Sequence, residues 1–152
     1  MAIRNIVKLG DPILYKKSRP VTNFDQRLFQ ILDDMKDTLY DAKGAGLAAV
    51  QVGILRRIVV MDCGDGYLEL INPEITERSE ELQYDTEGCL SIPGKYGITE
   101  RPKTVIVKAQ NREGKWCIYK GSDLKARCFC HEIDHLDGIL YTSHVQGELE
   151  ND

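Results

Sequence analysis

The sequence predicts an α+β fold in which short antiparallel strands pack around a central helix bearing an HExxH motif, with a second helix near the N-terminus. Three observations support this. Residues 25–43 have the apolar period of an amphipathic helix, residues 58–120 contain short β-rich segments separated by turn signals, and the HExxH motif lies in a second helical stretch. Strands and helices distributed in this way are typical of the α+β class.

The chain length favours one domain, residues 1–152, whose end at 143–152 is expected to be a flexible acidic tail. A net charge of −4 argues against a nucleic-acid surface as the main function. The first eight residues have no apolar signal core, and no run is as long as a membrane span, so we expect a cytosolic protein. Five scattered cysteines then indicate reduced thiols rather than a disulfide framework.

The first predicted helix follows an irregular segment, residues 1–22, which contains turn signals at Asp11-Pro12 and Arg19-Pro20. Asp25 is a plausible N-cap, and Gly44 is a plausible C-terminal stop. The residues of its apolar face follow i, i+3, i+4 spacing and are Leu28, Ile31, Leu32, Met35, Leu39 and Ala42.

Six strands are predicted next, at residues 58–62, 67–72, 75–84, 98–100, 104–110 and 115–120. Turn signals separate them at 64–66, 72–73, 93–94 and 113–114. The final helix is expected to begin near Ser122, whose hydroxyl can cap it, with Asp123 in the first turn. Gly138 is the natural stop for this helix.

The segment HEIDH, residues 131–135, is the most informative feature of the chain. Positions four apart share one face of a helix, so His131 and His135 can bind one metal ion. Glu132 lies beside them and could handle the protons of a water activated by that ion. The pattern therefore indicates metal-assisted hydrolysis, although a chance match on a charged helix is the alternative.

A catalytic metal usually needs a third protein ligand, and the usual protease patterns do not supply one here. Position 141, where one pattern needs a histidine, is Tyr141, and His144 lies just past the helix stop. A downstream acid would have to come from the expected flexible tail, which contains Glu148, Glu150 and Asp152. The third ligand must then come from upstream.

Cys89 is the best upstream candidate, because a glycine before it and a turn after it place it at the end of a strand. A thiolate and two imidazoles suit Zn²⁺ or another divalent first-row metal. The alternative is an ordinary packed cysteine. A structural zinc site at Cys128, Cys130 and His131 also competes, but positions two apart on a helix do not share a face, and Cys128 is expected on the apolar side with Leu124.

Taken together, these segments resemble the peptide deformylase family. The family's three motifs occur here in order, as GAGLAAVQ at 44–51, EGCLS at 87–91 and HEIDH at 131–135. The resemblance covers the chain from about Ile6 to Tyr141. It implies an enzyme that removes formate from the N-terminal formyl-methionine of newly made polypeptides.

The resemblance also implies a role for each motif residue. Cys89, His131 and His135 would bind the metal, and Glu132 would be the catalytic acid/base. The side-chain amide of Gln51 and the backbone N–H of Leu90 would bind the oxyanion. The residues expected to bind the peptide are Gly44, Ala45, Gly46, Gly88, Leu124 and Cys128.

One divalent ion is the implied cofactor, with Fe²⁺ as the expected native metal and Zn²⁺, Ni²⁺ or Co²⁺ as alternatives. The implied partners are N-formyl-methionyl nascent peptides in the bacterial cytoplasm, with a transient ribosome contact and with neither a specific nucleic-acid sequence nor a membrane. Ala45 departs from the branched aliphatic residue usual in the family and predicts a wider methionine pocket. Cys130 occupies a position that is commonly glutamine.

Two other functions remain compatible with these residues. One is a metal-dependent amidase that acts on a different small N-acyl group. The other is a metal-binding module without turnover, because folds can keep a site after losing its chemistry. The presence of both Glu132 and Gln51 favours an enzyme over the module.

Overall fold

The computed structural model describes residues 2–151, which form two α-helices and eight strands, so the predicted α+β class is confirmed. The helices are α1 (Gln26–Asp41) and α2 (Leu124–Leu136). The strands are β1 (Gly46–Ala48), β2 (Ile58–Asp62), β3 (Tyr67–Arg78), β4 (Leu82–Cys89), β5 (Ile92–Pro102), β6 (Thr104–Gln110), β7 (Trp116–Ser122) and β8 (Glu150–Asn151). Short 3-10 helices cover Pro12–Tyr15, Ala49–Val52 and Tyr141–His144.

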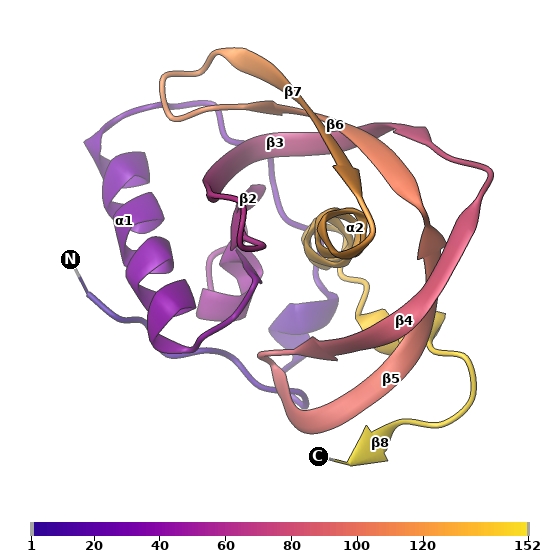
Figure 1. Cartoon of the computed structure of the whole chain (residues 1–152). Coiled ribbons are helices and arrows are strands. Elements are labelled where there is room, and N and C mark those ends of the chain that lie inside the picture. The colour runs from indigo at the N-terminus through magenta and orange to yellow at the C-terminus, as the bar shows by residue number, and fades with distance from the viewer. Residues whose placement is uncertain (1, 152) are drawn as a thin grey trace.

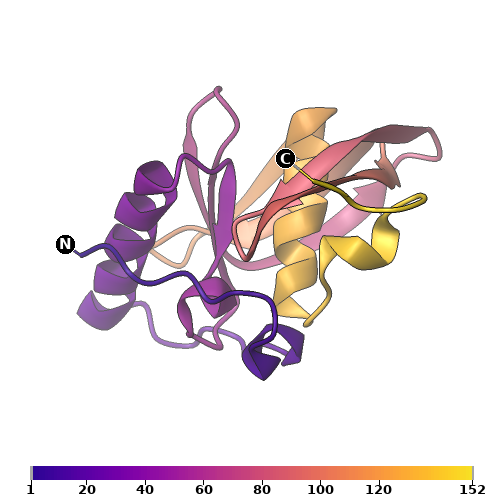
Figure 2. The ribbon, with the colours of Figure 1, turned by 90° about the horizontal axis from the view of Figure 1, so that it is seen from below.

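The strands form two antiparallel sheets with α2 between them. A five-stranded sheet has the order β1-β2-β3-β6-β7, and a three-stranded sheet has the order β4-β5-β8. Figure 1 shows α2 end-on at the centre of the molecule, with strands of both sheets around it and α1 at one side. The turned view in Figure 2 shows α1 and α2 separated by strands. The helix that carries HExxH is therefore central, as predicted.

Strand β2 explains how the larger sheet holds both helices. Successive side chains of a strand point to opposite faces. Ile58 and Val60 accordingly join the apolar cluster that contains Leu32 and Leu39 of α1. Val59 and Met61 join a separate cluster that contains the apolar residues of α2, namely Ala126, Phe129, Ile133 and Leu136.

The N-terminus of α1 is as predicted, because the Asp25 carboxylate accepts a 3.1 Å hydrogen bond from the Leu28 N–H. At its C-terminus the left-handed residue is Lys43, with φ 55°, and the Gly44 N–H donates to the Leu39 carbonyl at 3.1 Å. Gly44 thus helps to end the helix without needing a positive φ. A larger residue is disfavoured at this position for a different reason, because a Cβ there would lie 2.8 Å from the Leu90 side chain.

The predicted cap of α2 is wrong, although the helix begins at Leu124, near the predicted start. Ser122 belongs to β7, where its hydroxyl lies 3.0 Å from that of Thr104, and it does not cap the helix. Asp123 precedes the helix with φ 55° and ψ −121°, and its side chain makes no capping hydrogen bond. The chain instead turns abruptly from strand to helix at this residue. The predicted stop at Gly138 is confirmed by a φ of 75° directly after the C-cap.

Two strand predictions, 58–62 and 104–110, are confirmed at both ends. The predicted strand 75–84 is wrong, because β3 ends at Arg78 and β4 begins at Leu82. The signals at 72–73 and 93–94 also mislead, since they lie inside β3 and β5. Asn72 has φ 53° where β3 shifts register against β6, so this pair marks an irregularity in a strand rather than a turn.

The segment expected to form a flexible tail makes defined contacts with β5. Val145 forms a β-bridge with Thr99, and β8 pairs with Lys95 and Tyr96. Asp152 lies outside the described residues, and the flexibility of the tail stays a prediction. Over residues 2–151, neither helix has the length and apolarity that crossing a membrane requires.

Asn72 tests how the irregularity in β3 is stabilised. Its side chain accepts from the Val21 N–H at 2.8 Å and donates to the Val21 carbonyl and the Gln110 side chain at 2.9 and 2.7 Å. Asn72→Ala should lower the free energy of unfolding by about 2–3 kcal/mol, because these bonds are lost and alanine tolerates a positive φ poorly. Urea unfolding measures this, with Glu74→Ala on the exposed part of β3 as the control. If Asn72→Ala lowers the free energy of unfolding no more than Glu74→Ala does, the Asn72 side chain does not stabilise the irregularity in β3.

Candidate active site

Three predicted ligands meet in one cluster. The ligand atoms of Cys89, His131 and His135 all lie within 4.8 Å of one another, and the Cys89 Sγ is 3.4 Å from the His135 Nε2. Among residues 2–151 this is the group of three histidine, cysteine or acidic side chains that could hold a metal ion. Both histidines are buried and Cys89 is half-buried. The competing zinc site at Cys128, Cys130 and His131 is not formed.

The local backbone explains why these side chains converge. His131 and His135 are one turn apart on α2, and their rings contact edge to face with centroids 5.1 Å apart. Cys89 ends β4, where a register shift follows Glu87 and a tight turn pairs Cys89 with Ile92 of β5. The end of β4 therefore places the Cys89 thiol next to the face of α2 that carries the two imidazoles.

The geometry fits a divalent ion. Tetrahedral coordination with Zn–S near 2.3 Å and Zn–N near 2.0–2.1 Å places neighbouring ligand atoms about 3.3–3.6 Å apart. The 3.4 Å separation of Cys89 and His135 lies in this range. The His131 Nδ1 is hydrogen-bonded elsewhere, which leaves its Nε2 for the cluster. The residues present therefore suit one metal ion of the Zn²⁺ or Fe²⁺ type.

Glu87 fixes the ring of His131, a role that the sequence analysis missed. Its carboxylate lies 2.9 Å from the His131 Nδ1 and accepts bonds of 2.9 and 3.0 Å from Arg101. Thr99 also donates to it. Burial alone would raise the pKa of Glu87, but the bonds from His131 and Arg101 outweigh it and hold the pKa at about 2. A carboxylate behind a ligand histidine is a usual feature of metal sites.

Asp134 makes no direct hydrogen bond to His131 or His135 among the described residues. It accepts a 2.8 Å bond from Arg101, and the His144 Nε2 lies 3.2 Å from its carboxylate. It therefore acts on His131 only through Arg101 and Glu87. His144 is held by Asp134 and takes no part in the three-ligand cluster.

Glu132 lies beside the cluster. One carboxylate oxygen lies 3.9 Å from the His131 Nε2, and the other is buried with no hydrogen-bond partner among the described residues. Burial raises its pKa to about 7. A Cβ on Gly46 would lie 2.6 Å from this carboxylate, so the glycine leaves the space that Glu132 occupies.

Gln51 lies next to the cluster, as the motif implied. Its side-chain N–H groups donate to the Cys89 Sγ at 3.6 Å and the Ser91 hydroxyl at 3.1 Å. Its side-chain oxygen accepts from the Ala48 N–H at 2.9 Å. The bond from Ala48, the last residue of β1, thus helps to hold the amide nitrogen beside the sulfur.

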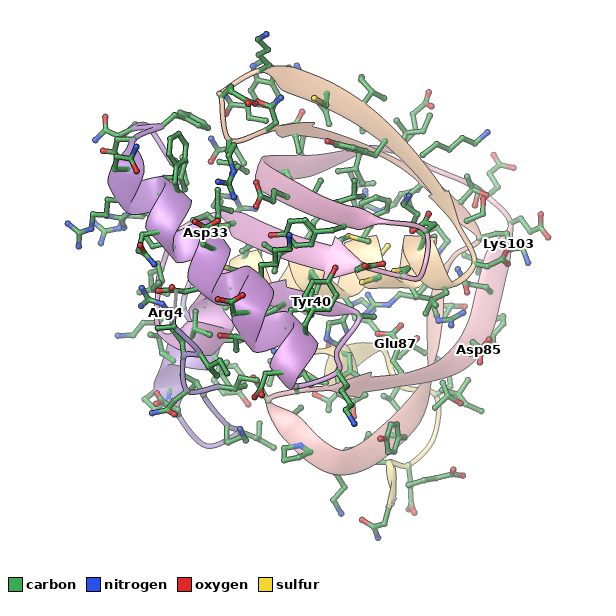
Figure 3. All side chains as sticks on the ribbon, turned by 60° about the vertical axis from the view of Figure 1, so that its left-hand side comes forward. Arg4, Asp33, Tyr40, Asp85, Glu87 and Lys103 are labelled. Atoms are coloured by element: carbon green, nitrogen blue, oxygen red, sulfur yellow. The ribbon has the colours of Figure 1, made fainter. Side chains whose placement is uncertain are left out.

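A cleft of about 420 Å³ opens beside the cluster. Its walls come from β1 and the preceding loop, from β4 and β5, and from α2. Figure 3 labels Glu87 and Asp85 on β4. Glu87 points towards the interior, whereas Asp85 lies nearer the start of the strand. The lining includes every residue expected to bind the peptide: Gly44, Ala45, Gly46, Gly88, Leu124 and Cys128. It also includes Leu90 and Arg127, and Arg127 was not anticipated from the sequence.

The signal that could have revealed Glu87 is its place as the first residue of the EGCLS motif at 87–91, two residues before Cys89. Helix periodicity could have revealed Arg127, which lies three residues after Leu124 and four before His131.

Comparison with known proteins agrees with this geometry. The family model of polypeptide deformylase matches residues 3–151. A peptide deformylase of Finegoldia magna is 56% identical over 147 residues, which are 95% of this chain and 91% of the relative. The crystal structure of the Thermotoga maritima peptide deformylase superposes with a TM-score of 0.94 at 41% identity, covering 97% of this chain and 100% of the other.

A further neighbour is the Synechococcus elongatus peptide deformylase in complex with actinonin. It has a TM-score of 0.92 and 40% identity, and the match covers 95% of this chain and 79% of that one. The family model, the relatives and the solved structures thus agree over nearly the whole length of the sequence. The chain belongs to the polypeptide deformylase family.

Proposed function

We propose that this chain removes the formyl group from the N-terminal formyl-methionine of newly synthesised polypeptides and releases formate, with its metal held by Cys89, His131 and His135. The observation that supports this most is the cluster of two buried histidines and a cysteine, which opens on a cleft beside the buried Glu132. Membership of the family supports the reaction, and the cluster supplies residues that can perform it.

A divalent ion bound here would supply Lewis acidity, which polarises the formamide carbonyl and lowers the pKa of water towards about 7. Fe²⁺ is the native ion that the family resemblance favours. Thiolate and imidazole ligands also suit Zn²⁺, Ni²⁺ and Co²⁺. Glu87 supports any of these ions equally, because it fixes the orientation of the His131 ring rather than contacting the cluster's open side.

Glu132 is assigned both proton transfers. It accepts the proton of the attacking water and donates it to the leaving amine. A general acid–base group works best when its pKa is near the working pH, and burial places the pKa of Glu132 at about 7. Its unpartnered oxygen supports this assignment, because a purely structural carboxylate at this depth would be expected to have protein partners.

Gln51 and Leu90 are assigned to the oxyanion. The Gln51 amide is already oriented by its bond to Ala48, so little reorganisation is needed during the reaction. One preorganised amide donor is typically worth ~3–4 kcal/mol in the transition state. Leu90 lines the cleft next to Cys89, which supports a role for its backbone N–H.

The peptide is assigned to the free edge of β1. This strand pairs with β2 on one side only and ends the larger sheet, and the segment from Gly44 to Gly46 lines the cleft. An extended peptide can add to such an edge through main-chain hydrogen bonds, which suits substrates of varied sequence. Nascent chains, transiently at the ribosome in the bacterial cytoplasm, are the proposed source of these peptides.

One assay separates this proposal from its alternatives. Formate release from formyl-Met-Ala and acetate release from acetyl-Met-Ala are measured with the same metal-loaded protein. The proposal requires formate release to dominate. Dominant acetate release would indicate an amidase for another acyl group, and release of neither would indicate a binding module.

Cys89→Ala should abolish tight metal binding, because two imidazoles alone make a weak site. Metal content after dialysis is measured by elemental analysis. Cys117→Ala is the matched control, because Cys117 is another half-buried free thiol and lies on β7 outside the cluster. Full occupancy in Cys89→Ala would exclude it as a ligand.

Glu132→Gln should keep about one equivalent of metal, since the three ligands remain. Its kcat should fall by at least ~10²–10⁴-fold, because acid–base groups usually contribute this much and Glu132 would serve two steps. The amide has the shape of the carboxylate, so folding should change little. Loss of the metal would make Glu132 a ligand or a structural support, and substantial remaining activity would place the base elsewhere.

The iron-loaded protein should lose activity in air faster than the nickel- or zinc-loaded protein. A thiolate on a redox-active ion is exposed to peroxide chemistry, and iron leaves the site as Fe³⁺. The half-life of activity and the metal content are followed together under air and under nitrogen. Equal lifetimes for the three metals would show that oxidation at Cys89 does not limit the enzyme.

A further inference from the structure

Arg127 occupies the part of the cleft next to the metal cluster. It lies one turn before His131 on α2, and residues four apart on a helix are neighbours at about 5–6 Å between Cβ atoms. Leu124, Arg127, Cys128, His131 and Glu132 all line the cleft from this helix. A peptide whose formyl group reaches the cluster therefore has its first side chain within reach of this face.

The Arg127 side chain is held in place from one side. Its Nη1 donates to the Gln83 side-chain oxygen at 2.7 Å and lies 3.3 Å from the Asp85 carboxylate. Gln83 is itself fixed, because its amide nitrogen donates to the Pro102 and Asp123 carbonyls at 3.0 and 2.9 Å. The Arg127 side chain is only 11% exposed, so it is a fixed feature of the wall rather than a mobile surface cation.

The Nε of Arg127 is buried and has no acceptor among residues 2–151. A buried N–H without a partner is costly, and such a group in a native structure calls for an explanation. A tether between α2 and β4 would need only the Nη1 contacts. Arg127 lines the cleft, whose wall is otherwise built largely from apolar and small side chains such as Leu124, Cys128 and Ala45.

We propose that Arg127 is a specificity-determining residue whose guanidinium binds an oxygen acceptor at the end of the substrate's first side chain. This rests on the proposed deformylase function and adds a substrate class to it. The thioether of methionine is a weak acceptor, whereas the oxygen of methionine sulfoxide is a strong one. Ala45, a small residue, also lines this cleft. Peptides that begin with formyl-methionine sulfoxide are therefore substrates alongside those that begin with formyl-methionine.

The experiment compares three formyl peptides that differ only in the first residue: methionine, methionine sulfoxide and norleucine. Norleucine has the shape of methionine without an acceptor. The zinc- or nickel-loaded wild-type protein and Arg127→Met are assayed by formate release. Lys125→Met is the matched control, because Lys125 lies on the same helix but pairs with Asp65 at 2.8 Å and does not line the cleft.

The wild-type protein should process the sulfoxide peptide with a kcat/KM within roughly tenfold of that for methionine. In Arg127→Met the ratio of kcat/KM for the sulfoxide peptide to that for the norleucine peptide should fall by about tenfold or more. The reason is that the sulfoxide oxygen loses its hydrogen-bond donor, whereas norleucine never used one. Lys125→Met should leave this ratio unchanged. Metal content and melting temperature are measured for all three proteins.

A purely structural role would lower kcat/KM for the three peptides by the same factor, or lower the melting temperature without changing the ratio, and either result overturns the inference. Rejection of the sulfoxide peptide by the wild-type protein overturns it as well. Absence of formate release from every peptide is a different outcome, because it contradicts the proposed function itself.

Discussion

The buried ion pair between Glu87 and Arg101 is the interaction on which the rest of the site depends. The two side chains are only 6% and 3% exposed, and they join β4 to β5 directly beneath α2. Burying two charges is costly unless their remaining hydrogen-bonding groups are satisfied. Here the carboxylate also binds His131 and Thr99, and the guanidinium also binds Asp134. The pair therefore locks the strand that carries Cys89 onto the helix that carries both histidines.

This constraint explains why α2 has two unlike faces. Towards the larger sheet it presents Phe129, Ile133 and Leu136, which pack into an apolar cluster. Towards the smaller sheet it meets an inner surface that is polar although buried, formed by Gln83, Glu87, Thr99 and Arg101. Apolar burial can hold the helix in place without fixing a ring orientation. The hydrogen-bonded face supplies that orientation, which metal binding requires.

The sequence predicts those features that depend on local periodicity. A β-rich run before the turn signal at 64–66 marks Ile58–Asp62, and helical spacing places His131 and His135 on one face. Features that depend on contacts between distant segments are not readable in the same way. Glu87 and His131 are 44 residues apart, and nothing local to either residue indicates the pair. Asn72 looks like a turn residue in the sequence because asparagine tolerates the left-handed backbone that turns often need. In the structure Asn72 adopts that backbone at an irregularity within a strand.

Arg101 of β5 and Arg127 of α2 separate the orientation of His131 from side-chain selectivity. Arg101 acts on His131 through Glu87, whereas Arg127 is held by Gln83 and Asp85, which lie nearer the start of β4 than Glu87 does. The two guanidinium groups share no hydrogen-bond partner in these contacts. Changes near Arg127 can therefore alter what the cleft accepts while leaving the ligand histidine oriented. A substitution at Arg101 could not do so, because it would leave a buried carboxylate without its counter-charge directly behind His131.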